Sequence, residues 1–304
     1  MNNYNPDAIE VIILGGSYAG LSAAMALGRS LRNVLIIDNG LPCNRQTPHS
    51  HNFLTQDGEK PAEIARKAKE QVLAYSTVHW LEDTAVKGEK TQHGFLITTT
   101  SGKSFTAKKL VVATGVKDNL PDIKGLAACW GISVVHCPYC HGYEIRNQKT
   151  GILANGDKAI HLASLVKNLT DDLTILTSGK ADFSPEQQAK LERHNIKVVE
   201  LEVVEIEHDG GVLKSLLLID GSKAGFDAVY AAVPFEQHSH IPAALGCELT
   251  EHHHIQIDHL QRTSVPGVYA CGDNSSGMRS VANAVSSGNL TGGMVNKELT
   301  DESF

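Results

Sequence analysis

Runs of consecutive apolar residues recur through the first part of the chain and predict buried strands. The first run ends at Leu14 and is followed by a glycine-rich turn, a stretch of small apolar residues typical of a helix, and a second run that ends in Asp38. This order of strand, turn, helix and strand is a βαβ unit. The elements expected in this part are strands at 9–14, 33–38, 95–100 and 110–115, and helices at 21–27 and 61–75.

The same pattern begins again near residue 149. A strand-like run, a short polar turn, a helical segment and a further strand-like run predict a second βαβ unit. Turn signals at 209–211 and 220–221 then predict hairpins, and a strand that ends in Gly272-Asp273 precedes a last helix. The elements expected here are strands at 149–153, 173–177, 201–206, 216–219 and 267–273, and helices at 159–166 and 280–295.

Two nucleotide-type units that share one tail predict an α/β fold with two Rossmann-like three-layer nucleotide-binding domains, the second inserted into the first. We expect the outer domain to comprise residues 1–116 and 245–304, and the inner domain to comprise residues 117–244. The length of 304 residues agrees with this division, at roughly 150 residues per domain.

Composition and charge exclude several classes of protein. Apolar residues make up 41% and charged residues 20% of the chain, as in soluble globular proteins. The 27 Lys and Arg are outnumbered by 34 Asp and Glu, so we expect no nucleic acid partner. No apolar run reaches the roughly 18 residues that a membrane span requires, and the polar start of the chain lacks the features of a signal peptide. We therefore expect a cytoplasmic protein without membrane contact.

The turn from Gly15 to Gly20 has the spacing of a dinucleotide-binding fingerprint, with Ser17 in place of the middle glycine. Gly15 permits the tight turn, Ser17 is small enough for close approach of a pyrophosphate, and Gly20 allows the helix to pack closely. The helix N-terminus favours the phosphate charge. Asp38, 18 residues after Gly20, can accept hydrogen bonds from ribose hydroxyls. The alternative is an ordinary βαβ turn.

The segment Cys137-Pro138-Tyr139-Cys140 is the sharpest chemical signal in the chain. Two intervening residues allow the sulfur atoms to form a small disulfide ring or to bind one metal ion. Redox catalysis is the favoured interpretation because the other four cysteines are isolated, whereas structural zinc usually needs a second ligand pair. Structural zinc and inert buried thiols remain the alternatives.

The residues around this pair suit thiol chemistry. Pro138 fits the first position of a helix, whose positive end lowers the pKa of a nearby cysteine. His141 follows directly and can take or give a proton as thiolate and disulfide interconvert. By contrast, the run His252-His253-His254 has no regular ligand spacing, so we predict a solvated turn there and no metal site.

These motifs occur in the order and spacing of the low-molecular-weight thioredoxin reductases, which are FAD-dependent pyridine nucleotide-disulfide oxidoreductases. The resemblance covers essentially the whole chain, including the exit Ala113-Thr114-Gly115 and the tail from Pro266 to Asp273. Within that superfamily, the segment from Cys137 to Glu144 resembles more closely the dithiol oxidases, which close disulfides in sulfur-containing metabolites. An Asp usually follows the second Cys in the reductases, whereas this chain has His141.

The resemblance implies that FAD lies along the first domain. It assigns the pyrophosphate to the first glycine turn, the adenosine side to Asp38 and Val86, and the flavin-side loop to Asn52. Family members commonly have Arg-Gln-Ala where this chain has Arg279-Ser280-Val281, so backbone contacts are expected there. The residues assigned to FAD are Gly15, Ser17, Ala19, Gly20, Asp38, Asn52, Val86, Ala113, Thr114, Gly115, Gly272, Asp273 and Val281.

By the same resemblance, Cys140 exchanges electrons with the flavin and Cys137 forms the mixed disulfide with the outside substrate. The second nucleotide unit departs from the reductases, because its turn begins with Ala154 and contains Asp157. Only Lys180 stands where the reductases carry a His-Arg-Arg cluster that neutralises the 2'-phosphate of NADPH. NADPH use is therefore doubtful, and we expect the second unit to be a scaffold for the Cys pair.

The resulting expectation is an FAD enzyme that moves two electrons between its flavin, the Cys pair and an external substrate without relying on NADPH. The substrate is a small dithiol or disulfide, or a thioredoxin-like protein. The alternatives are an NADPH-dependent thioredoxin reductase and a non-catalytic flavin redox sensor. The family resemblance also implies a homodimer.

Overall fold

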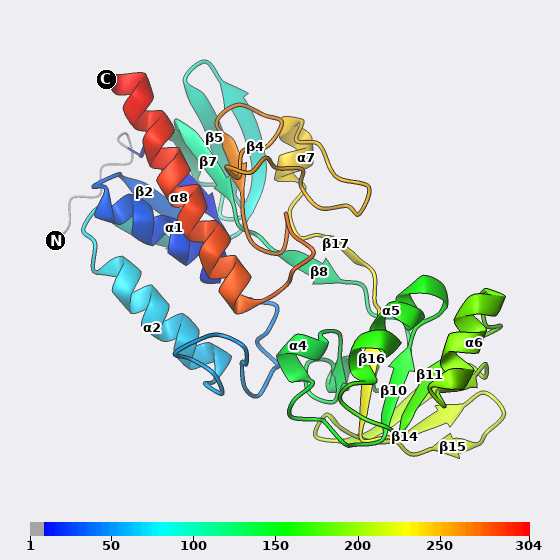
Figure 1. Cartoon of the computed structure of the whole chain (residues 1–304). Coiled ribbons are helices and arrows are strands. Elements are labelled where there is room, and N and C mark those ends of the chain that lie inside the picture. The colour runs from blue at the N-terminus through cyan, green and yellow to red at the C-terminus, as the bar shows by residue number, and fades with distance from the viewer. Residues whose placement is uncertain (1–8) are drawn as a thin grey trace. The chain divides into compact units, whose positions relative to one another are not determined.

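A computed structural model describes residues 9–304 and divides the chain into two compact units (Figure 1). Within the described residues, unit 1 comprises 9–45, 52–117 and 236–304, and unit 2 comprises 46–51 and 118–235. Each unit is built on a five-stranded parallel sheet. The predicted class, an α/β fold with two Rossmann-like domains, is confirmed.

The parallel sheet of unit 1 has the strand order β18-β7-β1-β2-β3. Its central strands β1 and β7 are buried along their whole length because both faces of the sheet are covered. The predicted βαβ unit begins it, since β1 pairs with β2 in parallel register. The strands are β1 (Val11–Leu14), β2 (Val34–Asp38), β3 (Val78–Glu82), β7 (Lys109–Val112) and β18 (Val268–Ala270).

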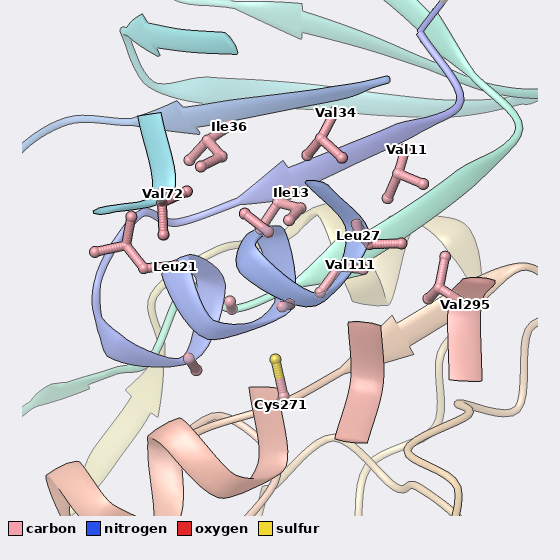
Figure 2. Packing of buried hydrophobic residues seen from close by; sticks show 14 of the residues in the cluster. Val11, Ile13, Leu21, Leu27, Val34, Ile36, Val72, Val111, Cys271 and Val295 are labelled. Atoms are coloured by element: carbon pink, nitrogen blue, oxygen red, sulfur yellow. The ribbon is translucent and has the colours of Figure 1, made fainter. Parts of the chain in front are cut away.

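Different layers cover the two faces of this sheet. Val11 and Ile13 of β1 pack into a core with the helices, and Figure 2 shows this cluster. Ile12 and Leu14 belong to a second core that includes Ile97 of an antiparallel three-stranded sheet. The elements of these layers are α1 (Tyr18–Arg29), α2 (Pro61–Leu73), α7 (Ile241–Leu245), α8 (Val281–Ser303), β4 (Ala85–Thr91), β5 (Gly94–Thr99) and β6 (Ser104–Ala107).

Unit 2 repeats this plan with the strand order β12-β11-β10-β16-β9. One core joins the sheet to α5 and α6, and another joins it to the antiparallel strands β13, β14 and β15. The sheet strands are β9 (Val134–Val135), β10 (Thr150–Leu153), β11 (Leu173–Leu176), β12 (Lys197–Val199) and β16 (Ala228–Ala231). The other elements are α3 (Leu126–Cys129), α4 (Pro138–His141), α5 (Gly156–Val166), α6 (Pro185–Arg193), β13 (Val203–Asp209), β14 (Val212–Leu218) and β15 (Lys223–Ala224).

Strands β8 (Val116–Asp118) and β17 (Phe235–Gln237) pair with each other and contain two of the four points where the chain passes between the units. Among the helices of residues 9–304, none has both the length and the apolar composition needed to cross a membrane.

Candidate functional site

The turn between β1 and α1 passes so close to other backbone that only glycine fits. Gly15 has a φ of +97°, and a Cβ atom there would lie 2.3 Å from the carbonyl oxygen of Ala113. A Cβ at Gly20 would lie 1.9 Å from the carbonyl oxygen of Gly15. The end of β1, the exit of β7 and the first turn of α1 therefore meet at one edge of the sheet, as in dinucleotide-binding folds.

The N-terminus of α1 has backbone donors but no capping side chain. Ser17 is the N-cap residue and makes no side-chain cap hydrogen bond. Ala19 in the first turn is buried and lies against the exit of β18, because a Cβ at Gly272 would be 3.0 Å from the Cβ of Ala19. The first backbone N–H groups of a helix have no partner within the helix, and the helix dipole is positive at this end. Both features favour the binding of a phosphate group.

Asp38 ends β2 beside the same turn. Its Oδ1 accepts a hydrogen bond from Gly16 N at 2.7 Å, and its Oδ2 accepts one from Gly40 N at 2.9 Å. A carboxylate has about four lone-pair sites, so both oxygen atoms can still accept bonds from hydroxyl groups. Trp80 packs against the same turn, since a Cβ at Gly16 would lie 2.2 Å from its ring.

Two buried polar atoms near the exits of β7 and β18 have no hydrogen-bond partner within residues 9–304. They are Thr114 Oγ1 and Asn274 Oδ1. Asn274 is fully buried, and its amide nitrogen donates to the carbonyl of Val112 at 2.9 Å. Gly115 has a φ of +65° with open space where a Cβ would stand. Buried polar atoms are normally paired, so this edge suits a bound polar group.

The other residues of unit 1 that the family resemblance assigns to FAD lie on different elements. Asp273 pairs with Arg279 at 3.5 Å, and Val281 is the first residue of α8. Asn52 has a φ of +60°, and its backbone N–H donates to Asp57 at 2.7 Å. Val86 is 57% exposed and stands at a register shift of β4, where the ladder with β5 is interrupted.

The Cys pair lies in unit 2 around the four-residue helix α4. Pro138 begins this helix, as predicted, and Cys137 is the N-cap residue in an extended conformation. The backbone N–H of Cys140 donates to the carbonyl of Cys137 at 3.3 Å. Both cysteines are half-buried, whereas Tyr139 between them is 69% exposed. The two sulfur-bearing residues thus flank one short turn with a side open to a substrate.

His141 is neutral at physiological pH. Burial, and then the neighbouring charge of His51, lower its pKa from 6.5 to about 4. His51 comes from the 46–51 segment of unit 2, and its Nδ1 lies 3.6 Å from Oε1 of Glu144. Glu144 lies in the segment already singled out from Cys137 to Glu144, whereas His51 could not be recognised as a neighbour of the pair, because 85 or more positions separate it from the cysteines.

The nucleotide-type turn of unit 2 is closed by side chains of the protein. Asn155 Oδ1 accepts hydrogen bonds at 2.9 Å from the N–H groups of Gly156 and Asp182, and Asn155 Nδ2 donates to Lys180 O at 2.9 Å. Gln187 donates to Asp157 at 2.7 Å. The network therefore ties the turn to the loop after β11.

Three carboxylates lie at this turn or in the loop beside it, together with Lys158 in the first turn of α5. Asp157 is in the first turn of α5, and Oδ2 of Asp182 would be 3.8 Å from a Cβ at Gly156. Glu200 accepts a hydrogen bond from Ala181 N at 2.7 Å, in the same loop as Lys180. Asp157 and Lys180 are visible in the sequence, whereas the place of Asp182 beside the turn depends on the folded loop.

Within residues 9–304, no group of three or more His, Cys, Asp and Glu side chains is arranged to hold a metal ion. The run from His252 to His254 lies in a loop outside the helices and strands.

Two Rossmann-like units, a glycine turn in unit 1 and a Cys pair in unit 2 are together typical of nucleotide-binding oxidoreductases with two domains. Residues 9–288 match the family described as pyridine nucleotide-disulphide oxidoreductase, and the chain belongs to this family. Within the family it is similar to thioredoxin reductases. Thioredoxin reductase tcpT of Claviceps purpurea is 31% identical over 96% of this chain and 94% of the relative.

Two solved structures are similar to this chain in both sequence and fold. The putative thioredoxin reductase TrxB from Bacillus anthracis has a TM-score of 0.92 and 32% identity, and the match covers 97% of this chain and 100% of that one. An oxidoreductase from Agrobacterium tumefaciens has a TM-score of 0.90 and 35% identity, with coverage of 96% and 99%. The likeness therefore extends over both units.

FAD is the cofactor of this class of enzymes, and the residues of unit 1 fit it. The backbone turn at Gly15 and Gly20 leaves no room for a side chain, and no side chain caps the helix that follows. Asp38 retains acceptor capacity for ribose hydroxyls, and Thr114 Oγ1 and Asn274 Oδ1 are buried polar atoms that a ligand can satisfy.

Proposed function

We propose that this protein is an FAD-dependent thiol-disulfide oxidoreductase that oxidises external dithiols through Cys137 and Cys140 and does not depend on NADPH. The closed turn of unit 2 is the observation that supports independence from NADPH. Asn155 caps the N–H of Gly156, where a nucleotide pyrophosphate would be bound, and Asp182 lies beside it. Carboxylates at this position repel a pyrophosphate and a 2'-phosphate, and Lys180 is the lone cation of the loop at 177–183.

In this proposal the cofactor is held in unit 1 by the residues that the family resemblance assigns to it. The turn at Gly15, Ser17, Ala19 and Gly20 binds the pyrophosphate through backbone N–H groups, and Asp38 accepts hydrogen bonds from the ribose. The other residues in the proposed set are Asn52, Val86, Ala113, Thr114, Gly115, Gly272, Asp273 and Val281. When bound, FAD supplies the two-electron acceptor that returns the Cys pair to its disulfide, with oxygen or another carrier as the final acceptor.

The Cys pair carries out thiol-disulfide exchange. A thiolate of the substrate attacks Cys137 in the disulfide form of the pair, so a mixed disulfide forms and Cys140 leaves as a thiolate. The second substrate thiolate then attacks the substrate sulfur of the mixed disulfide and releases Cys137 as a thiolate. The substrate departs as a disulfide after losing two electrons and two protons, and the pair has gained the two electrons.

His141 accepts a proton in this sequence. Its lowered pKa of about 4 leaves the imidazole neutral at physiological pH, with a ring nitrogen that can accept the proton of an incoming thiol. His141 is therefore the proposed base beside the pair.

The second candidate is an NADPH-dependent thioredoxin reductase. Relatives that carry the name thioredoxin reductase favour it, including one from Helicobacter pylori that is 27% identical over 87% of this chain. In that case Lys180 and backbone donors of unit 2 bind the pyridine nucleotide, and electrons pass to a thioredoxin-like protein.

An anaerobic absorbance titration separates the candidates. One sample receives NADPH and another receives dithiothreitol, while the visible flavin band is followed. We expect dithiothreitol to bleach the band and air to restore it, and we expect dithiothreitol to have no rapid effect on Cys140→Ser. Rapid bleaching by stoichiometric NADPH would instead support the reductase. Failure of both reagents would leave the non-catalytic redox sensor.

Partners follow from the same proposal. The substrate is a small dithiol or disulfide, and a thioredoxin-like protein is the substrate of the reductase alternative. We also propose a homodimer in solution, on the basis of the family resemblance, and sedimentation equilibrium measures it directly.

A further inference from the structure

Two exposed tyrosines flank the second cysteine of the pair. Within residues 9–304, Tyr139 and Tyr143 are the tyrosines whose side chains are exposed, and each is 69% exposed. Tyr139 lies between the two cysteines, and Tyr143 comes three residues after Cys140. An aromatic ring offers a large apolar surface, so a ligand that reaches the sulfur atoms and covers these rings gains contact with both.

The turns that carry these tyrosines are fixed to the core of unit 2. The backbone N–H of Gly142 donates to the carbonyl of Pro138 at 2.8 Å, and that of Glu144 donates to the carbonyl of His141 at 3.2 Å. Gly142 itself is buried, and a Cβ there would lie 2.4 Å from the side chain of Leu169. The segment therefore packs inward at Gly142 and exposes its tyrosines beside the Cys pair.

Tyr143 is also held in place by a cation. The central guanidinium carbon of Arg146 lies 3.8 Å from the centre of the Tyr143 ring, and Arg146 donates a hydrogen bond to the carbonyl of Tyr143. Arg146 thus binds both the side chain and the backbone of one residue. Because the ring is ordered before a ligand arrives, binding to it costs less conformational entropy.

The exposed apolar surface at the pair is too small for a protein interface. A protein partner of ordinary affinity buries about 800 Å² on each side, whereas two aromatic side chains supply roughly 300–500 Å² at most. The other exposed large apolar side chains of unit 2 belong to the segment 198–219 and not to the Cys segment. They are Val198, Leu201, Val212 and Ile219. The surface is therefore suited to one small molecule.

We propose that Tyr139 and Tyr143 bind an aromatic ring of a small dithiol substrate and make the enzyme selective for dithiols that carry such a ring. This inference deepens the proposed function and rests on it, because it requires Cys137 to react with an external substrate. An aromatic ring packs against tyrosine in offset or edge-on geometry more favourably than a saturated ring of similar size. Arg146 is a positioning residue that acts through Tyr143.

The experiment compares two thiol reagents that differ in their ring. The reagents are benzyl methanethiosulfonate and cyclohexylmethyl methanethiosulfonate, and the protein is the flavin-containing Cys140→Ser variant. The Cys137 thiolate attacks the sulfenyl sulfur of either reagent, a disulfide forms and methanesulfinate leaves. Peptide mass spectrometry without reduction follows the rate at Cys137, and each rate is divided by the rate of the same reagent with glutathione.

We expect Cys137 to react faster with the benzyl reagent than with the cyclohexylmethyl reagent, by roughly two- to tenfold for each tyrosine that contacts the ring. Tyr139→Leu and Tyr143→Leu should each lower this preference by the same factor. Arg146→Ala should also lower it, but should have no further effect in the Tyr143→Leu protein, because a positioning residue acts through the ring that it holds. Additive losses would overturn the positioning role of Arg146.

Two controls come from the same chain. Cys43 is an exposed cysteine of unit 1, so its benzyl preference should be the same in all variants. Ile219 is an exposed apolar residue of unit 2 outside the Cys segment, and Ile219→Ala should leave the preference at Cys137 unchanged.

The outcomes separate this inference from the proposed function. Equal corrected rates of the two reagents at Cys137 would overturn the inference, even if the wild-type enzyme oxidises dithiothreitol. The inference is also wrong if the tyrosine variants slow the reaction of Cys137 with oxidised thioredoxin and change neither small reagent. If the variants remove a benzyl preference but the wild-type protein fails to oxidise dithiothreitol aerobically, the role of the tyrosines stands and the proposed function is wrong.

Discussion

At the scale of single residues, the proposed chemistry depends on two half-buried sulfur atoms on either side of one helical turn. A single remaining cysteine cannot form the internal disulfide, so Cys137→Ser and Cys140→Ser should each abolish dithiol turnover. The purified proteins should remain yellow, because neither residue belongs to the proposed FAD site in unit 1. A steady-state assay with dithiothreitol and an absorbance spectrum check both statements.

Cys43→Ser is the control for these variants, because Cys43 is an exposed cysteine of unit 1. Its turnover should match that of the wild-type protein. Substantial activity in either Cys137→Ser or Cys140→Ser would refute the proposed mechanism.

His141 links the site to the pH dependence of stability. Its folded-state pKa of about 4 is below the value of roughly 6.5 in an unfolded chain, so the unfolded state binds more protons between these values. Stability should therefore be lost as pH falls from about 6.5 to about 4, by at most about 3 kcal/mol from this group. Urea unfolding at several pH values measures the slope.

His141→Asn should make that slope smaller, whereas His93→Asn, at an exposed turn, should leave it unchanged. An unaltered slope in His141→Asn would show that burial of this imidazole does not set the acid sensitivity.

At the scale of elements, close approach of α8 to α1 depends on glycine. A Cβ at Gly288 would lie 2.1 Å from the carbonyl oxygen of Ala19, whereas a Cβ at Gly293 would meet nothing within 4 Å. We expect Gly288→Ala to destabilise the fold by roughly 1–3 kcal/mol through overpacking. Gly293→Ala should stabilise it by up to about 1 kcal/mol, because alanine has the higher helix propensity.

Chemical denaturation of the two variants measures the difference, with Gly293→Ala as the matched control on the same helix. Equal stability of the two proteins would contradict the close packing of α1 and α8.

The sequence predicted the elements that have long apolar runs. β1, β2, β10 and β11 are buried on both faces, so their composition alone identifies them. β3 has only one buried residue and β9 is two residues long, so neither has a detectable period. α4 was indicated only by Pro138 at its start.

The candidate site, too, could be predicted only in part from the sequence. The glycine turn and the Cys pair are local motifs, so the sequence shows them directly. Asp182 becomes relevant only through Gly156, a neighbour that folding brings to it.

At the scale of the whole molecule, each unit has its own parallel sheet and its own cores. The proposed FAD residues all belong to unit 1, and the closed turn and the Cys pair belong to unit 2. The proposed cofactor site and the proposed thiol exchange therefore belong to separate units of the fold.

This separation predicts a local response to cofactor removal. A ligand that binds the native state stabilises the structure that it contacts, so FAD removal should raise hydrogen exchange in unit 1. We expect the increase at the start of α1, at 113–115 and at 272–273, while the sheet core formed by β10, β11 and β16 keeps its protection. Mass spectrometry of the holoprotein and the flavin-depleted protein measures both regions, and re-addition of FAD should restore the original pattern. Loss of protection confined to unit 2 would place the cofactor elsewhere and overturn the assigned residues.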